Sequence, residues 1–156
     1  QLDYFERMLL RANIRLMEMT EGRYELVRSK EAENKRSQSG LSLDVVDHYS
    51  GSERSVKSLS GGESFQASLA LALGLSDTVQ EEAGGIRLDA MFIDEGFGTL
   101  SEGALRAALN TLLELAAGQR LVGVISHVPE LKEKIERQIR IRKQADGGSS
   151  AEIILP

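Results

Sequence analysis

The sequence has no cysteine among its 156 residues. A disulfide scaffold and a zinc site with thiolate ligands are therefore excluded, and the composition fits a reducing compartment. The sequence also lacks an apolar run long enough to cross a bilayer, and it shows no secretory signal, so no membrane association is predicted.

Positive charge is outweighed, since 19 lysines and arginines stand against 24 aspartates and glutamates and the formal net charge is −5. The chain as a whole is therefore not an electrostatic nucleic-acid binder, and any such contact must come from a local basic surface. The length and the 41% of hydrophobic residues fit one compact domain. Because the chain opens with Gln1, inside an apparent helix, we expect it to be a fragment of a longer protein.

The first 20 residues have apolar side chains at alternating spacings of three and four, the pattern of a coiled-coil seam. This pattern has two interpretations: a helix that packs on the domain, or the end of a returning coiled coil. Gly22 is expected to end this helix. The seam consists of Leu2, Phe5, Leu9, Ala12, Leu16 and Met19.

The next segment is predicted to form strands at 24–28 and 41–46, separated by a polar loop at 29–40 and followed by a turn at 49–53. A long apolar helix then begins near residue 61 and ends before the Gly84-Gly85 pair.

A strand at 88–95, a helix at 102–117 and a strand at 121–127 follow, and Gly118 ends the helix. Strands rich in apolar residues and joined by a helix predict a parallel pair that is buried on both faces. The right-handed crossover brings the carboxyl ends of both strands to one sheet edge, where ligands of open α/β sheets bind. Asp94, Glu95 and His127 are therefore expected to converge. A short helix at 130–136 and strands at 138–143 and 151–155 are predicted to end the chain.

The segment Ser60-Gly61-Gly62-Glu63 begins the long helix. The spacing of Ser60 and Glu63 is that of a capping box. It does not explain the two glycines, which leave the amide groups at a helix N-terminus open to a phosphate. Capping and phosphate contact are both consistent with this segment.

The segment MFIDEGFGTL, residues 91–100, places Asp94 and Glu95 at a strand end. An acid there suits Mg²⁺, and a second acid can activate an attacking water. The alternative is an acidic turn without chemistry. His127 has the same two interpretations, and its predicted place beside the acids favours a functional one.

In their order and spacing, LSGGE, FIDEGFGTL and ISH resemble the signature motif, the Walker B motif with its D-loop, and the switch histidine of ABC-type ATPases. The flanking text, VKSLSGGESFQASLALALGLSD, resembles the SbcC group of DNA-repair ATPases, which are related to SMC proteins. The resemblance implies an α/β fold, the C-terminal lobe of an ABC-type P-loop ATPase head, with a mostly parallel sheet flanked by helices. Residues 1–20 would end a returning coiled coil, and residues 21–156 would form the C-terminal half of the head.

The resemblance also implies roles for individual residues. Asp94 would help to hold Mg²⁺, Glu95 would activate water, and His127 would contact the γ-phosphate of ATP. The signature residues would act on the nucleotide of a second head, together with the D-loop; the group commonly has an acid where this chain has Ser101. These residues are Ser60, Gly61, Gly62 and Glu63 in the signature motif and Gly98, Thr99, Leu100 and Ser101 in the D-loop.

No glycine is followed by lysine anywhere in the chain, so the phosphate loop G-x-x-x-x-G-K-[ST] is absent. The resemblance accounts for this, because the group's head is split by its coiled coil and the Walker A half precedes it. The implied partners are that half, a second copy of the head in a homodimer, an SbcD-type nuclease subunit and DNA. The implied setting is the bacterial cytoplasm, near the nucleoid, and the implied process is DNA-end processing in repair and recombination.

Two other functions remain open: a structural SMC-like dimerisation head, and the nucleotide-binding subunit of an ABC transporter. The amino-terminal heptads and Gly96 argue against the transporter. A basic stretch at 132–143 could contact DNA, or it could be an ordinary solvated face.

Overall fold

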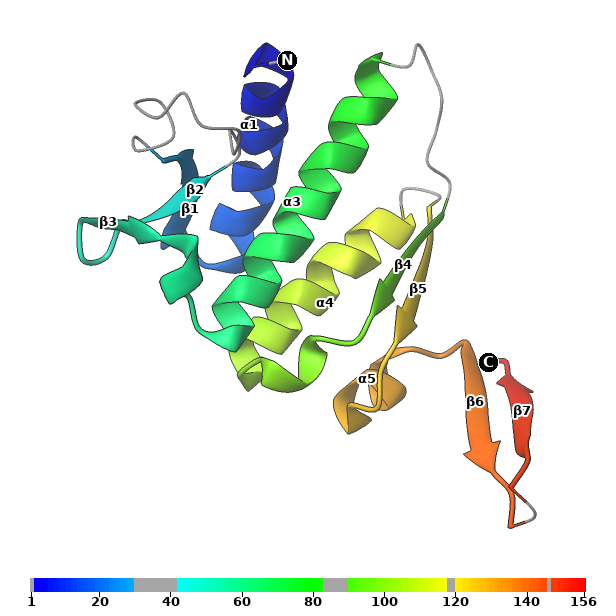
Figure 1. Cartoon of the computed structure of the whole chain (residues 1–156). Helices are drawn as coiled ribbons and strands as arrows, with labels where there is room; N and C mark the ends of the chain where they lie inside the picture. The colour runs from blue at the N-terminus through cyan, green and yellow to red at the C-terminus, as the bar shows by residue number, and fades with distance from the viewer. Residues whose placement is uncertain (1, 30–41, 83–89, 118–119, 146) are drawn as a thin grey trace. The chain divides into compact units, whose positions relative to one another are not determined.

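The computed structural model describes residues 2–29, 42–82, 90–117, 120–145 and 147–156 (Figure 1). It divides into two units, Gln1–Ile125 and Ser126–Pro156, and each is described by itself. The loop predicted at 29–40, the Gly84-Gly85 break and the helix end at Gly118 lie largely or wholly outside the described residues. No helix among the described residues is long and apolar enough to span a membrane.

Helix α1, Leu2–Met19, packs on helix α3, Gly61–Glu82. The predicted seam supplies much of the buried face, since Leu9, Ala12 and Leu16 are all buried. The seam is therefore used inside the domain, as the first of the two interpretations requires. A second apolar set on α1, which includes Leu10 and Ile14, is exposed, and the exit into a coiled coil stays a prediction.

Gly74 sets how closely α1 and α3 approach. A Cβ atom at this position would lie 2.6 Å from the backbone nitrogen of Ala12 and 2.7 Å from the carbonyl oxygen of Met8. Three arginines of α1 pair with acids near the end of α3: Arg7 with Glu82, Arg11 with Glu81, and Arg15 with Asp77. The two helices thus pack backbone to backbone at Gly74, and three ion pairs continue the contact toward the end of α3.

The end of α1 leads into an antiparallel sheet of β1, Tyr24–Arg28, β2, Leu43–Asp47, and β3, Ser52–Ser55, in the order β1-β2-β3. Gly22 adopts φ 78° after the helix, as expected. The side-chain amide of Asn13 exchanges two hydrogen bonds of 2.8 Å with the backbone of Leu26, which ties β1 to α1. The predicted turn at 49–53 is too long, because β3 already begins at Ser52.

Strands β4, Ala90–Asp94, and β5, Leu121–Ile125, form the predicted parallel pair, joined through helix α4, Glu102–Ala117. Their predicted burial on both faces is wrong for the described residues. Phe92, Leu121 and Ile125 are 70%, 62% and 57% exposed, because no described element covers that face. The other two sheets of the described structure are antiparallel, so parallel pairing is confined to β4 and β5.

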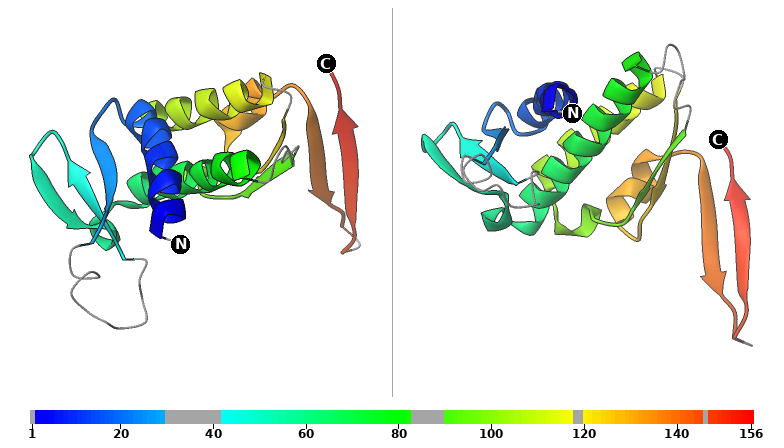
Figure 2. Two further views of the ribbon diagram at one scale, coloured as in Figure 1. Left: turned by 90° about the horizontal axis from the view of Figure 1, so that it is seen from above. Right: turned by 45° about the horizontal axis from the view of Figure 1, so that its top comes forward.

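Helices α1, α3 and α4 lie between the three-stranded sheet and the β4–β5 pair, as the views in Figures 1 and 2 agree. The core of this unit contains Leu26, Val45 and Leu73, all nearly inaccessible to solvent.

The second unit contains helix α5, Pro129–Lys134, and a hairpin of β6, Gln138–Lys143, and β7, Ser149–Ile154. The predicted helix and strand pair are both present, although β7 starts two residues earlier than expected. Ile139, Ile141 and Ile153 share one face of this hairpin, and all are well exposed.

Candidate functional site

The predicted capping box is present at the start of α3. The backbone N–H of Ser60 donates to Glu63 Oε2 over 2.8 Å, and the backbone N–H of Glu63 donates to Ser60 Oγ over 3.3 Å. The Ser60 hydroxyl therefore acts as an acceptor within the cap. Ser60 and Gly61 are exposed.

Gly61 and Gly62 have a structural role that the sequence analysis missed. A Cβ atom on Gly62 would lie 3.0 Å from the carbonyl oxygen of Thr99, and one on Gly61 would lie 3.4 Å from Thr99 Cβ. The two glycines let residues 99 and 100 pack directly on the helix start. The predicted signature and D-loop segments are therefore neighbours, and this packing by itself favours glycine at both positions.

The two acids differ in backbone conformation. Asp94 is the last residue of β4 and is exposed. Glu95 has φ 57° and Gly96 has φ 98°, so the chain passes through two left-handed residues in succession. This conformation costs a glutamate more free energy than it costs a glycine. The N–H of Glu95 donates to the carbonyl oxygen of Ile125 over 2.9 Å, which fixes the turn to the end of β5.

Phe65 of α3 packs on this acid turn. A Cβ atom on Gly96 would lie 2.3 Å from the Phe65 ring. The Phe65 ring also meets Phe97 edge to face, with 4.8 Å between centroids. Phe97 begins the short 3₁₀ helix η2, Phe97–Thr99, and is almost fully buried. One aromatic pair thus joins the Walker B-like turn to the helix that carries the signature-like segment.

The D-loop segment leads into α4 through a serine cap. Ser101 Oγ accepts a hydrogen bond of 3.3 Å from the N–H of Ala104, so Ser101 is the N-cap of this helix. Thr99 Oγ1 donates to the carbonyl oxygen of Gly96 over 3.0 Å. Gly98 lies inside η2 between these anchors. Whether this segment contacts a second head stays a prediction.

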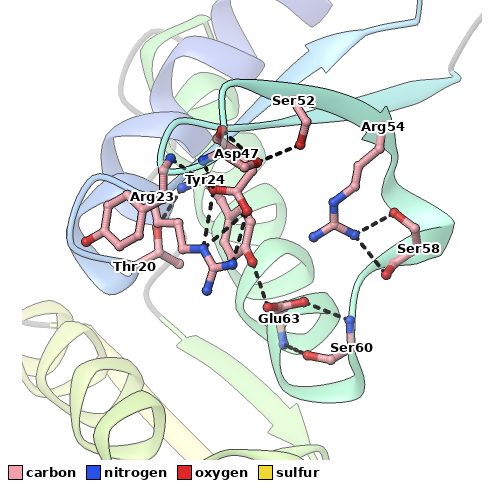
Figure 3. A network of polar contacts seen from close by, with 11 residues as sticks. Thr20, Arg23, Tyr24, Asp47, Ser52, Arg54, Ser58, Ser60 and Glu63 are labelled. Carbon is pink, nitrogen blue, oxygen red and sulfur yellow. Dashed lines mark hydrogen bonds and ion pairs between the residues drawn. The ribbon is translucent and has the colours of Figure 1, made fainter.

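A polar network, drawn in Figure 3, joins the start of α3 to the three-stranded sheet. The hydroxyl of Tyr24 donates to Glu63 Oε1 over 2.7 Å. Arg23 forms an ion pair of 3.0 Å with Asp47, and its guanidinium lies 4.7 Å from the centroid of the Tyr24 ring. No sequence signal pointed to Tyr24, which looked like an ordinary strand residue.

The network changes the pKa values of its members. Burial alone would raise the pKa of Glu63, but hydrogen bonds from Ser60 and Tyr24 outweigh it and hold the value below the ordinary range. Burial, and next the hydrogen bond to Glu63, raises the pKa of Tyr24. The hydrogen bond from Arg23 lowers the pKa of Asp47. At neutral pH, Glu63 and Asp47 are therefore ionised and Tyr24 is neutral.

A cavity of about 470 Å³ opens between the end of α1 and the starts of α3 and α4. Arg23, Ser60 and Glu63 line one part of it, and Thr99 and Ser101 line another. The signature-like and D-loop segments thus share a recess that is open to one side.

His127 belongs to the second unit, so its predicted approach to Asp94 and Glu95 stays a prediction. It is exposed and lies between Ser126 and Val128, whose N–H donates to Ser126 Oγ over 3.1 Å before α5 begins. In the same unit, Arg142 of the basic stretch pairs with Glu152 across the hairpin at 3.3 Å. Part of that basic charge is therefore neutralised locally.

The described residues contain no group of three or more histidines, aspartates or glutamates placed to hold a metal ion. A single carboxylate such as Asp94 is still a suitable donor for Mg²⁺, which usually keeps several water ligands and takes the rest from phosphate oxygens.

Comparison with known proteins gives two kinds of match. Residues 30–114 match the model of the family described as "SbcC/RAD50-like, Walker B motif". The chain is 58% identical over 132 residues to the SbcC subunit of the nuclease SbcCD from Staphylococcus saprophyticus, and 49% identical over 139 residues to the protein of the same name from Staphylococcus aureus strain JH9. These matches cover 85% and 89% of this chain, but only 13% and 14% of the two relatives.

Solved structures resemble the chain over nearly its whole length. One comes from work titled "Structural biochemistry of ATP-driven dimerization and DNA stimulated activation of SMC ATPases", with a TM-score of 0.72 and 13% identity over 96% of this chain and 84% of that one. Another is an SmcHead bound to the C-winged helix domain of ScpA, with a TM-score of 0.74 and 15% identity over 99% of this chain and 44% of that one.

Proposed function

Because the chain belongs to the SbcC/RAD50-like Walker B family and has the fold of an SMC ATPase head, we propose that it is the C-terminal part of an ATP-hydrolysing head. This head dimerises on ATP and regulates a partner nuclease that processes DNA ends in double-strand break repair. The chain spans 13–14% of the length of the relatives cited above, so this activity is assigned to the longer protein.

One observation carries the proposal: the signature-like, Walker B-like and D-loop segments pack on one another. Gly61 and Gly62 contact Thr99 and Leu100, and Phe65 contacts Gly96. A head that binds one nucleotide and presents a second surface to the nucleotide of its partner needs these segments to move as one body.

In the proposed mechanism, Asp94, Glu95 and His127 serve the nucleotide of their own head. Asp94 supplies a carboxylate to Mg²⁺, which would neutralise phosphate charge when bound. Glu95, in the left-handed turn after β4, accepts a proton from the attacking water. His127 donates a hydrogen bond to the γ-phosphate.

The signature residues serve the nucleotide of a second head. The Ser60 hydroxyl donates to a phosphate oxygen of that nucleotide, and the amide groups of Gly61 and Gly62 lie at the positive end of α3. The D-loop residues lie against them and would meet the partner head. Loss of the γ-phosphate removes these contacts and lets the heads part.

The missing phosphate loop is proposed to lie in a Walker A half that precedes this chain in the longer protein. The exposed face of β4 and β5 supports this, since Phe92, Leu121 and Ile125 form an apolar surface that a further segment of the protein would cover. The name of the relatives, a nuclease subunit, supports an SbcD-type partner, and their staphylococcal origin supports a bacterial cytoplasmic setting. DNA as a further partner is proposed from the family alone.

The test compares this chain alone with the same chain joined to the preceding half. The chain alone is expected to show no ATP hydrolysis, and the joined protein is expected to hydrolyse ATP. Glu95→Gln in the joined protein should abolish turnover and trap an ATP-bound dimer, detectable by size-exclusion chromatography with light scattering.

Glu102→Gln is the matched control, because Glu102 is an exposed acid whose partner is Arg106 in the next turn of α4. It should leave turnover unchanged. Normal turnover by the Glu95→Gln protein would remove Glu95 from its role, and hydrolysis by this chain alone would contradict the division of the head into two halves.

A further inference from the structure

The signature turn, residues 58–63, is attached to the three-stranded sheet first through Ser58 and second through Glu63 (Figure 3). Arg54 of β3 donates to the carbonyl oxygen of Ser58 over 2.9 Å and to the Ser58 hydroxyl over 2.6 Å. Tyr24 of β1 donates to Glu63 over 2.7 Å. Only the second attachment continues to Ser60, because Glu63 also accepts from the Ser60 N–H.

Both carboxylate oxygens of Glu63 accept hydrogen bonds from within the chain, Oε1 from Tyr24 and Oε2 from Ser60. Hydrogen bonds to an ionised acceptor are the strong ones, so this carboxylate is held in one orientation. An ionised carboxylate also repels a triphosphate. Glu63 is therefore better suited to hold Ser60 than to bind a nucleotide itself.

Tyr24 is itself held firmly. Its side chain belongs to the core, and only 3% of the residue is exposed. Its N–H donates to Thr20 Oγ1 over 3.2 Å, and the Thr20 hydroxyl donates to the carbonyl oxygen of Leu16 over 2.7 Å. Tyr24 is thus fixed relative to the end of α1. Its hydrogen bond in turn fixes the position of the Glu63 carboxylate.

We propose that Tyr24 is a positioning residue for the signature turn, acting through Glu63 on the Ser60 hydroxyl and the Gly61 and Gly62 amides. This inference rests on the proposed function, since those groups are the ones that would meet the nucleotide of a second head. Glu63, which the resemblance assigns to nucleotide contact, then acts through Ser60. Tyr24 itself touches no nucleotide.

The test uses the joined protein and the change Tyr24→Phe, which removes one hydroxyl and keeps the ring. Turnover and ATP-dependent association of the heads should each fall about tenfold, the effect of losing a hydrogen bond to a charged group. Nucleotide affinity, measured at dilutions where the heads are monomeric, should not change, because the phosphate contacts of the same head are untouched.

Tyr49→Phe is the matched control. Tyr49 lies near the network, its hydroxyl donates to the carbonyl oxygen of Glu21 over 3.3 Å, and the residue is 67% exposed. This change should leave turnover and association within about twofold of the wild-type values. If Tyr24→Phe behaves like Tyr49→Phe, the inference is wrong.

A double-mutant cycle with Glu63→Gln separates a relay from two independent contacts. If both residues act along one connection, the double variant should be no worse than Glu63→Gln alone. If the fold-changes of the two single variants multiply in the double variant, the relay is contradicted. A loss of nucleotide affinity in the monomeric Tyr24→Phe protein would contradict it as well. Thermal unfolding of each variant ensures that folded proteins are compared at the assay temperature.

The two proposals fail in different ways. If the wild-type joined protein does not hydrolyse ATP and its heads do not associate in the presence of ATP, the proposed function fails. If it does both, and Glu95→Gln traps the dimer while Tyr24→Phe is normal, only the role of Tyr24 fails.

Discussion

The α1–α3 contact and the β4–β5 pair are two parts of the same unit, and they differ in how completely this chain builds them. Between α1 and α3 the packing is closed, with Ala12 and Leu73 inaccessible to solvent and Gly74 against the opposite backbone. On β4 and β5 one face is half-buried, while the other leaves Phe92 and Leu121 exposed. The two helices thus bury their shared face, whereas the parallel strands leave one apolar face open to solvent.

The largest expected effect comes from adding a side chain where the backbones of α1 and α3 touch. Gly74→Val would place a side chain within 3 Å of the Ala12 and Met8 backbones, and we expect a loss of about 3 kcal/mol in the free energy of unfolding. Urea unfolding followed by circular dichroism measures it.

Gly103→Ala is the control for that change, because a Cβ atom there meets nothing within 4 Å. Its helical position in α4 predicts a gain of about 0.5–1 kcal/mol. A neutral Gly74→Val would show that the two helices are not closely packed.

The second effect should depend on whether the preceding half is present. Phe92→Ser on the open face should change the unfolding free energy of this chain alone by less than about 1 kcal/mol, since most of the ring is already in water. In the joined protein the same change should cost about 2 kcal/mol or more, the value of burying a phenylalanine side chain. Equal effects in the two proteins would mean that this face stays open.

A smaller effect is expected at Glu95, in the turn that follows the open strand β4. Because Glu95 has φ 57°, Glu95→Gly should be more stable than Glu95→Ala by about 1 kcal/mol. Differential scanning calorimetry of both variants tests this. If Glu95→Ala were the more stable variant, the backbone at Glu95 would not be strained.

The smallest effect is a pH dependence from the ion pair of Arg23 and Asp47, which lies outside both regions. The pKa of Asp47 lies below its ordinary value because of Arg23, so the pair stabilises the folded state above the ordinary aspartate range. That contribution should be lost as the pH falls below about 4, through the folded-state pKa. It should be modest, because Arg23 is partly exposed. Asp47→Asn should flatten this part of the stability profile measured in urea at several pH values; an unchanged profile would contradict the pairing.

The sequence predicted the features that depend on local signals. The capping box of Ser60 and Glu63 is confirmed, as are the parallel pair around α4 and the hairpin at the end of the chain. Helix capping, strand patterns and crossover length depend on a few consecutive residues or on one connection. They can therefore be predicted without knowing which residues are in contact in the folded chain.

The features that depend on contacts distant in the sequence were not predicted. Tyr24 meets Glu63 across 39 positions, and Gly62 meets Thr99 across 37. The open face of β4 and β5 was missed for a related reason: its apolar residues signal burial, but the sequence does not say which segment buries them. The site roles of Asp94, Glu95 and His127 stay predictions because they depend on a nucleotide and on a second unit.

Asn13 has a consequence for how strand β1 behaves in solution. Among the described strands β1 lies at the edge of its sheet, where free backbone groups can recruit a strand from another molecule. The amide of Asn13 occupies both the N–H and the carbonyl oxygen of Leu26, so a helix side chain stands where an added strand would pair. Asn13 thereby blocks strand addition, and the aggregation that could follow from it, at the middle of the β1 edge.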